Sequence, residues 1–349
     1  MCAFGRVLVV QKSMSDHNVI GQDHIEKHFQ NAIKSEKKSH AYIINGEEGS
    51  GKSALALEFA KALQCEQNAP DKENVTGTAC NKCKSCSQTD SGNQPDIKTV
   101  IPEKNKVGID DIRDQINNDI EILPYSSPYK IYIIPHSETM TTEAQNALLK
   151  TIEEPPAYAI IILLTTNIEN FLPTIMSRCV VLNIRPVEED VIAKDLKDKF
   201  AVSDYEAELA VAFAGGNVGQ AEKLIESEEF SDIKSSVVNA LTTLRDGGME
   251  DIKKSVDDAK QYKTNAQDYL DMVRMWMRDV LMLKTTYDEE SVVFKDDIVK
   301  LKEMAEAIKM AKMTDIFEAI EEAELRVKSN VNYNATIEML LLKIKEGIQ

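Results

Sequence analysis

The segment Gly46-Glu47-Glu48-Gly49-Ser50-Gly51-Lys52-Ser53 has the residue types and spacing of a phosphate-binding loop. Its glycines allow backbone N–H groups to turn toward a phosphate, Lys52 supplies a point charge, and Ser53 can ligate Mg²⁺. A β-branched run, Tyr42-Ile-Ile44, precedes the loop, and a helical pattern follows it. The segment therefore predicts a P-loop able to hold ATP or ADP. A glycine turn without a ligand is the alternative.

Four cysteines form a second group with chemical potential, with the spacing C-x14-C-x2-C-x2-C: Cys65, Cys80, Cys83 and Cys86. Three of them form a tight knuckle, and Cys65 closes the set from the end of the preceding helical pattern. Four thiolates with no open position are typical of a structural, tetrahedral zinc site. Redox chemistry is the alternative, because C-x-x-C steps can form dithiols. Cys2 and Cys179 have no such neighbours, and we expect ordinary thiols there.

The acids that a P-loop ATPase needs are missing from the matching strand. The strand expected at Lys130-Ile-Tyr-Ile-Ile134 ends in Pro135-His136-Ser137-Glu138. Hydrolysis requires an Asp at this tip to hold Mg²⁺ and a neighbouring Glu to polarise the attacking water. Glu138 lies further along and would need an unusual loop to reach the site. The sequence predicts a phosphate cradle without the hydrolytic residues.

Short apolar runs alternate with helical patterns through the first half of the chain. The runs are Ala41–Asn45, Ile97–Ile101, Lys130–Ile134, Ile160–Thr165 and Val180–Leu182, and the helical patterns include Lys52–Leu63, Ile109–Ile122 and Thr142–Ile152. Buried parallel strands joined by crossover helices on both faces give this alternation. We predict a doubly wound α/β domain.

After Arg185-Pro186 the pattern becomes helical. Residues 188–200, 204–213 and 218–227 read as three short helices, and helical periodicity continues from about Glu228 to the end. Ile316, Phe317, Ile320 and Ala323 share one helical face after Thr314, a candidate cap. We therefore predict an α/β domain over 14–185 with a zinc module at 65–86, a helical lid over 186–227 and a helical bundle over 228–349.

Composition limits the classes of function and location. A net charge of −17 argues against a protein whose main task is to grip DNA phosphates, because such proteins carry basic surfaces. The most apolar stretch, Ala159–Leu164, is the length of a strand, so we expect a cytosolic protein with no membrane partner. Residues 1–13 contain too short an apolar run for a signal peptide, and we interpret them as a leader or tag-like segment.

Several further segments resemble the bacterial DNA polymerase III clamp-loader family of the AAA+ superfamily, and most closely its delta-prime branch. Some surround the P-loop: Val19–Gln22, Ser39–Tyr42 and the cysteine knuckle. The others are Gln145–Pro156, Thr165–Asn167, Ser177-Arg178-Cys179, Asn330–Asn332 and Leu340–Lys343. The segment Asn146–Pro156 and the Ser-Arg-Cys triplet are specific to clamp loaders rather than to P-loop proteins in general.

The resemblance implies three domains, the last a helical collar that holds a hetero-pentamer together with motor gamma/tau and delta subunits. In this family, the assembled ring of subunits opens a sliding clamp and places it on primed DNA. In it, the arginine at position 178 enters the ATP site of the adjacent subunit as an arginine finger. Here Pro135-His136 replaces the acidic tip, and the stretch Gly216–Ala221 lacks the arginine that senses the γ-phosphate in ATPase members. Both differences imply the stationary subunit, the stator.

Two other classes of function remain as alternatives. A free-standing P-loop ATPase or kinase would need a carboxylate at the strand tip. A zinc-dependent DNA-binding regulator would need a basic knuckle, whereas Asn81, Lys82, Lys84 and Ser85 are only mildly basic and the chain is acidic.

Overall fold

The computed structural model describes residues 19–35, 38–69, 72, 75–104 and 106–348. The leader or tag-like segment proposed at residues 1–13 therefore lies outside the described residues. The chain forms two compact units. One extends to Val191 and also contains Asn217–Gln220, and the other contains Ile192–Gly216 and everything from Ala221 onward. The separate lid predicted at 186–227 remains a prediction.

A five-stranded parallel sheet forms the centre of the first unit, with strand order β2-β3-β4-β1-β5. The strands are β1 (Ala41–Asn45), β2 (Ile97–Thr99), β3 (Lys130–Ile134), β4 (Ala159–Thr165) and β5 (Val180–Asn183). Every residue of β3 and β4 is buried, as expected for central strands covered on both faces. The carboxyl ends of β1 and β4 meet in register, with Asn45 opposite Thr165.

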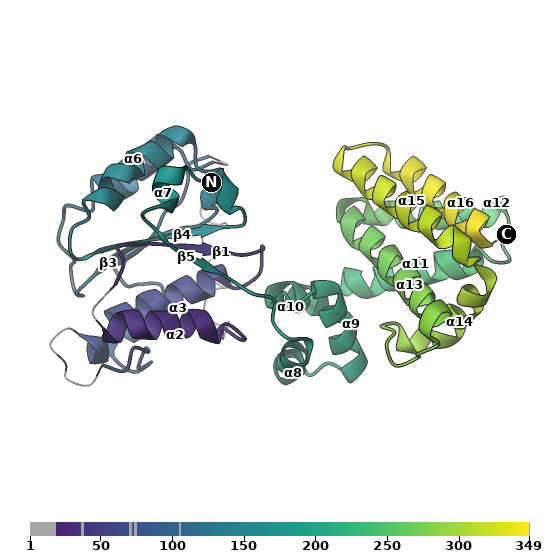
Figure 1. The fold of residues 1–349 in the computed structure, drawn as a ribbon, viewed down its shortest axis with the longest axis horizontal. Helices are drawn as coiled ribbons and strands as arrows, with labels where there is room; N and C mark the ends of the chain where they lie inside the picture. Colours follow the sequence, from purple (N-terminus) through teal and green to yellow (C-terminus); the bar gives the residue numbers. More distant parts are fainter. Residues whose placement is uncertain (1–18, 36–37, 70–71, 73–74, 105, 349) are drawn as a thin grey trace. The chain divides into compact units, whose positions relative to one another are not determined.

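Helices cover both faces of this sheet (Figure 1). One face carries α2 (Asp23–Lys34) and α3 (Lys52–Gln64), where Phe29 and Phe59 stack with ring centroids 3.9 Å apart. The other carries α5 (Ile109–Ile112) with the π-helix η2 (Arg113–Asn117), α6 (Thr142–Glu153) and α7 (Pro173–Met176). This arrangement confirms the predicted doubly wound α/β domain.

Short elements complete this unit: η1 (Glu66–Asn68), α4 (Lys84–Asp90), η3 (Ser137–Thr139) and η4 (Ile168–Asn170). The helix predicted over Ile109–Ile122 is shorter than expected, because α5 passes into the π-turn η2 and helical structure ends at Asn117. The strand predicted over Ile97–Ile101 ends at Thr99.

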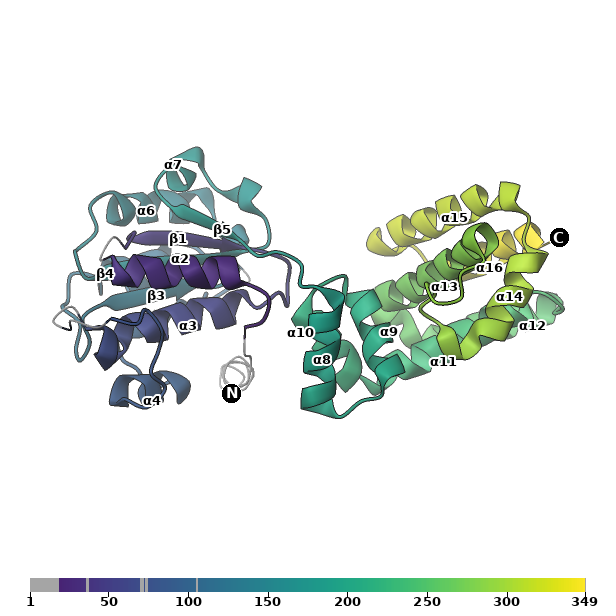
Figure 2. The same cartoon turned by 60° about the horizontal axis from the view of Figure 1, so that its bottom comes forward.

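In the second unit, the secondary-structure elements of the described residues are all helices (Figure 2). The three helices predicted after Pro186 are observed as α8 (Glu189–Phe200), α9 (Asp204–Ala214) and α10 (Val218–Glu226). The boundaries between the two units fall within α8 and around the start of α10. Ser203 caps α9 through a reciprocal capping box with Glu206. Gly215, with φ of +55°, ends α9 in the left-handed conformation that glycine adopts most easily.

A bundle forms the rest of this unit: α11 (Glu228–Thr243), α12 (Met249–Ala259), η5 (Lys260–Asn265), α13 (Ala266–Thr286), η6 (Lys295–Asp297), α14 (Ile298–Ala307), α15 (Met310–Lys328) and α16 (Tyr333–Ile348). Helix α13 is central and packs against α11, α14 and α15, with Trp276 and Met272 fully buried. The predicted cap at Thr314 is wrong: α15 begins at Met310, because Met313 is already part of the buried face. Among the described residues, no helix has the length and apolar content needed to cross a bilayer.

Candidate functional site: a P-loop and a four-cysteine cluster

The P-loop connects the end of β1 to the start of α3. The backbone N–H of Gly46 donates to the carbonyl of Thr165 (3.1 Å), which ties the start of the loop to the tip of β4. Gly49 and Gly51 have φ values of +83° and +87°, a backbone conformation that side chains rarely adopt. Gly51 then serves as the N-cap of α3. The segment therefore forms the predicted loop between a strand and a helix, and two of its glycines adopt backbone conformations that other residues rarely adopt.

Lys52 is held against its own loop. Its Nζ donates to the carbonyls of Gly46 (2.7 Å) and Glu47 (2.6 Å), and the Ser50 hydroxyl also donates to the Glu47 carbonyl (2.7 Å). Burial lowers the pKa of Lys52, while nearby carboxylates, first that of Glu138, act to raise it. Ser53 lies exposed in the first turn of α3. The ammonium is thus fixed within the loop, where a phosphate would meet it.

The loop has a second contact that the sequence did not reveal. Asn217, which is 4% exposed, donates from Nδ2 to the carbonyl of Glu48 (2.8 Å), and the N–H of Gly219 donates to the carbonyl of Gly49 (3.2 Å). A Cβ on Gly219 would lie 2.4 Å from that carbonyl oxygen. Within the stretch Gly216–Ala221, which lacks the arginine expected of ATPase members, position 219 therefore makes a backbone contact that a side chain would disrupt.

The tip of β3 carries no acid, but Glu138 reaches the P-loop edge of the sheet. His136 adopts a left-handed conformation (φ +50°), and the 3-10 turn η3 follows it. Oε2 of Glu138 accepts a hydrogen bond from the N–H of Thr166 (3.2 Å) at the tip of β4. The unusual loop that Glu138 was said to need is present: the turn that starts at His136 brings its carboxylate to the tip of β4.

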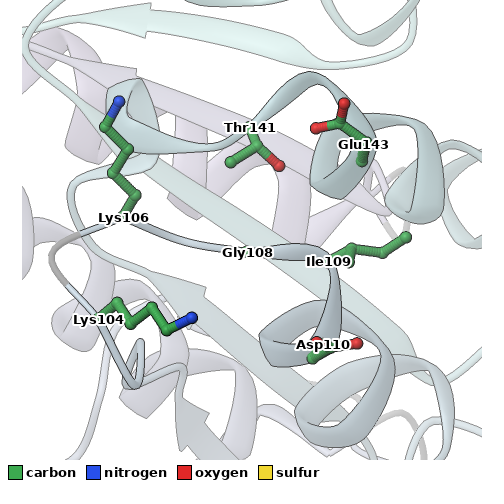
Figure 3. A pocket seen from close by; sticks show the side chains of 7 residues that line it. All are labelled: Lys104, Lys106, Gly108, Ile109, Asp110, Thr141 and Glu143. Atoms are coloured by element: carbon green, nitrogen blue, oxygen red, sulfur yellow. The ribbon is translucent and has the colours of Figure 1, made fainter.

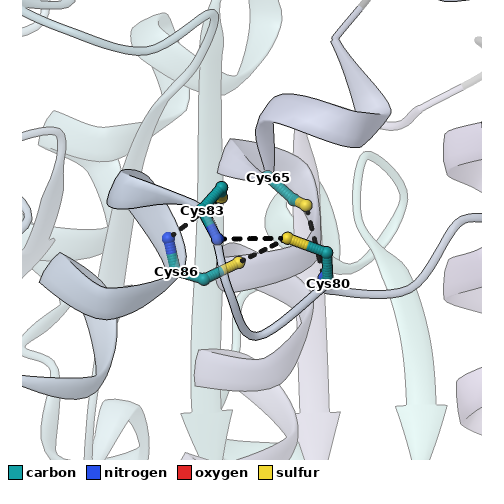
Figure 4. Close-up of side chains that lie close together, drawn as sticks. All are labelled: Cys65, Cys80, Cys83 and Cys86. Atoms are coloured by element: carbon teal, nitrogen blue, oxygen red, sulfur yellow. Dashed lines mark hydrogen bonds between the residues drawn. The ribbon is translucent and has the colours of Figure 1, made fainter.

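The four predicted cysteines lie together (Figure 4). Their sulfur atoms are all within 4.8 Å of one another. Four thiolates around a tetrahedral zinc ion are separated by about 3.8 Å, given Zn–S bonds of about 2.3 Å. Small adjustments would therefore fit these side chains around a metal ion. The donor set is all sulfur, the type that zinc prefers in structural sites.

Backbone N–H groups support the sulfur cluster. The N–H groups of Cys80, Cys83 and Cys86 point to the sulfurs of Cys65 (3.4 Å), Cys80 (3.3 Å) and Cys83 (3.4 Å) in turn. A hydrogen bond from the backbone of Lys82 is the main reason that the pKa of Cys80 falls to about 6. Burial raises the pKa of Cys65 and, more strongly, that of Cys86. N–H···S bonds of this kind favour thiolates, the form that binds metal.

Asn68 explains how the long spacing after Cys65 is accommodated. Its Nδ2 donates to the carbonyls of Ala62 and Thr78 (both 2.9 Å), and its Oδ1 accepts from the N–H of Gly77 (3.2 Å). Gly77 has a φ of +78°, and a Cβ there would lie 2.7 Å from the carbonyl oxygen of Gln30. These contacts return the chain to the end of α3, so that Cys80 meets Cys65.

Arg178 follows α7 and is half-exposed. Its guanidinium pairs with Oε1 of Glu153 (3.0 Å) and donates to the carbonyl of Thr174 (3.0 Å) and the hydroxyl of Ser177 (3.1 Å). The side chains of Arg178 and Glu153 are 40% and 47% exposed, so the pair is screened by water and weak. The guanidinium is therefore at the surface and easily released from Glu153.

An open pocket of about 830 Å³ lies elsewhere on the α/β unit (Figure 3). Lys104 and Lys106 come from the segment before α5, and Thr141 and Glu143 come from the start of α6; Gly108, Ile109 and Asp110 complete its lining. Two lysines face two carboxylates in this lining, so the pocket has no net charge preference.

A phosphate-binding loop between the first strand and its helix, in a five-stranded parallel sheet, defines the class of this molecule as a P-loop α/β protein. Comparison with protein families then matches residues 21–188 to "DNA polymerase III, delta subunit" and residues 256–346 to "DNA polymerase III, delta subunit, C terminal". The chain belongs to this family of DNA polymerase III clamp-loader subunits. The resemblance found from the residues is confirmed.

Two relatives from Bacillus subtilis agree with this assignment. DNA polymerase III subunit delta' of Bacillus subtilis is 29% identical over 339 residues, which cover 93% of this chain and 97% of the relative. Subunit tau of the same organism is 28% identical, over 94% of this chain but only 61% of its own length. Among solved structures, a DNA polymerase III gamma subunit-related protein from Thermotoga maritima has a TM-score of 0.47 and 20% identity, covering 93% of this chain and 99% of that one.

Proposed function

We propose that this chain is the stator of a bacterial replicative clamp loader. In this role it joins motor gamma/tau and delta subunits in a hetero-pentamer of the AAA+ class, and the complex loads a sliding clamp onto primed DNA. Family membership and the near-complete overlap with a delta' relative support this proposal. We expect the protein to act in the cytoplasm.

The observation that carries the stator role is a well-formed P-loop after β1 combined with a tip of β3, one strand away across β4, that reads Pro135-His136. With no acid at Pro135 or His136, Mg²⁺ lacks its usual carboxylate partner, and the carboxylate of the following turn, that of Glu138, is engaged by the N–H of Thr166. The stretch Gly216–Ala221 also lacks the arginine that would sense a γ-phosphate. We infer that the loop, residues Gly46 to Ser53, can hold ATP or ADP while the chain itself hydrolyses little or no ATP.

Arg178 gives such a subunit a role in the chemistry of its neighbour. Its charge is permanent, and its planar fork can contact two phosphate oxygens at once. The guanidinium is at the surface, and the one carboxylate that it pairs with among the described residues, that of Glu153, holds it weakly. We propose that it exchanges Glu153 for the phosphate of a nucleotide on the adjacent motor subunit and stabilises the charge that builds there during hydrolysis.

The cysteine cluster is proposed to hold one structural zinc through Cys65, Cys80, Cys83 and Cys86. Zinc with four thiolates has no open position and supplies folding energy rather than reactivity. The ion would fix the segment around α4 to the end of α3.

Reconstitution tests the proposal. The full chain is mixed with purified gamma/tau and delta subunits, and the products are separated by size-exclusion chromatography with light scattering. We expect a stable complex containing one copy of this chain. A chain that stays apart and hydrolyses ATP by itself would instead be a free-standing ATPase. One that stays apart and binds DNA only when zinc is present would be a zinc-dependent regulator.

A further inference from the structure

The segment that leads into β3, residues 121–129, carries large apolar side chains in contact with water. Ile122, Leu123 and Tyr125 are 61%, 71% and 87% exposed. We call this segment the apolar loop. Since these side chains have little packing to hold them, the shape of the loop depends on the bonds that its backbone makes.

The side chain of Asp96 holds the middle of the apolar loop. Its Oδ1 accepts the N–H of Tyr125 (2.6 Å). Its Oδ2 accepts the N–H groups of Ser126 (2.8 Å) and Ser127 (3.0 Å) and the hydroxyl of Ser126 (3.2 Å). Asp96 is only 1% exposed, and a buried carboxylate is stable where hydrogen bonds replace the water that it has lost. The carboxylate therefore fixes three consecutive backbone amides of the loop.

Gln94 joins the apolar loop to α4. Its Nε2 donates to the hydroxyl oxygens of Ser85 (2.8 Å) and Ser127 (3.2 Å), and its Oε1 accepts the hydroxyl of Ser126 (3.3 Å). Ser85 lies in α4, directly before Cys86, and both residues are buried. One connection of the loop therefore ends beside a cysteine of the cluster.

Gln64 makes a second connection, at the other end of the loop. Its Nε2 donates to the carbonyl of Tyr129 (2.6 Å), and its Oε1 accepts the N–H of the same residue (3.4 Å). Gln64 is buried and is the last residue of α3, directly before Cys65. The apolar loop is thus bonded to the neighbours of two cysteines, Cys65 and Cys86, that come from different elements.

We propose that the cysteine cluster, with its metal, sets the conformation of the apolar loop. A metal ion bound by Cys65 and Cys86 would hold the end of α3 at a fixed distance from α4. Gln64 and Gln94 can then bond to the loop at the same time. The inference rests on the proposed zinc site and adds the segment that this site positions.

Without the metal, α4 depends on fewer contacts. It has seven residues, Lys84–Asp90, and helices this short are unstable unless other parts of the chain hold them. Lys61 of α3 pairs with Asp90 (2.6 Å), which keeps α4 near α3. We therefore expect the loss of metal to loosen α4 and the apolar loop while the sheet stays folded.

Hydrogen exchange of the full, reduced chain tests the inference, with zinc bound and after its removal by a chelator. We expect exchange at Tyr125, Ser126 and Ser127 to accelerate at least ~10-fold without zinc, and to slow again when zinc is added back. Peptides from β4 should exchange at the same rate in both states. An apolar loop that exchanges equally fast with and without zinc would overturn the inference.

Ser85→Ala isolates the connection through Gln94, because it removes one hydrogen bond and keeps all four cysteines. Ser87→Ala makes the same change at an exposed position of α4 and is the matched control. With zinc bound, exchange in the apolar loop should rise about 2- to 10-fold in Ser85→Ala and stay unchanged in Ser87→Ala. Zinc removal should then have a smaller effect in Ser85→Ala than in the wild type, because it acts on a connection already broken. Equal effects would show that the metal does not act through Gln94 and would overturn the inference.

Other outcomes distinguish this inference from the proposals under which it stands. If the chain binds no zinc, the metal site and this inference are both wrong. If zinc binds but its removal accelerates exchange throughout the α/β unit, the ion supports the whole unit rather than this loop, and only the inference is wrong. The stator proposal is tested separately, by reconstitution.

Discussion

Asp119 provides a perturbation whose size can be worked out from the contacts of the α/β unit. Its carboxylate accepts bonds from the ammonium of Lys130 (2.9 Å) and the hydroxyl of Tyr132 (2.7 Å). Lys130 is 5% exposed and also donates to the carbonyls of Asp119 and Ile122. Burial alone would raise the pKa of Asp119, but the bonds from Lys98, Lys130 and Tyr132 outweigh it and hold the pKa at about 2.

Two estimates of how much the Asp119 carboxylate stabilises the α/β unit agree. A carboxyl pKa that falls from 3.8 to about 2 corresponds to about 2.4 kcal/mol of stability at neutral pH. Removing one partner of a buried ion pair typically lowers the free energy of unfolding by about 3–5 kcal/mol. The loss should be smaller here, because the Lys130 ammonium would still donate hydrogen bonds to two backbone carbonyls. We therefore expect Asp119→Asn to destabilise the α/β unit by about 2–3 kcal/mol, roughly 30- to 150-fold in its opening equilibrium.

Hydrogen exchange of peptides from β3 and β4 measures this loss in the α/β unit alone. The single tryptophan, Trp276, lies in the other unit, so its fluorescence transition should be unchanged and serves as an internal control. Glu121→Gln, an exposed neighbour, should leave exchange as in the wild type. A carboxyl group whose pKa is lowered by folding stabilises the folded state only at a pH above its pKa in the unfolded chain. The difference in exchange rate between wild type and Asp119→Asn should therefore shrink as the pH falls from about 4 toward about 2. Exchange in Asp119→Asn at the wild-type rate would refute the reasoning.

Three further predictions concern the candidate site. Purified, reduced protein should contain about one zinc per chain by elemental analysis, unchanged in Cys179→Ser; a folded chain without zinc would contradict the metal assignment. The isolated chain should hydrolyse ATP far below ~1 per second; turnover at that rate, abolished by Lys52→Ala, would show that hydrolytic residues were overlooked. Gly219→Ala places a Cβ 2.4 Å from the Gly49 carbonyl oxygen, so amide exchange at residue 219 should accelerate at least ~10-fold, and unchanged protection would show that the loop contact tolerates a side chain.

Signals that lie close together in the sequence predicted much of this molecule. The five strands are short, apolar and bounded by helical patterns, so their positions followed from periodicity. The P-loop and the cysteines are dense local motifs in which each residue type has a chemical reason. The contact of Asn217 with Glu48 could not be predicted, because it joins residues 169 positions apart and a single asparagine has many structural roles.

The position of Glu138 could not be derived from the sequence for a different reason. It depends on the left-handed conformation of His136, which precedes the 3-10 turn η3, and a non-glycine residue gives little sequence signal for that conformation. The cap predicted at Thr314 was wrong because a single cap residue is a weak signal. The burial of Met313 extends α15 toward the N-terminus, so that the helix already begins at Met310.

The central claim is that this subunit acts on its neighbour through Arg178, and one measurement tests it most directly. The DNA-stimulated ATPase rate is measured for the reconstituted complex carrying Arg178→Ala, with Glu153→Gln as the matched control that removes the in-chain partner but keeps the arginine. A finger supplied in trans is worth ~10³ or more in turnover, so the motor site that it serves should fall nearly silent. The complex should still assemble with its zinc, and Glu153→Gln should remain active. Wild-type ATPase and clamp-loading rates in the Arg178→Ala complex would contradict the account.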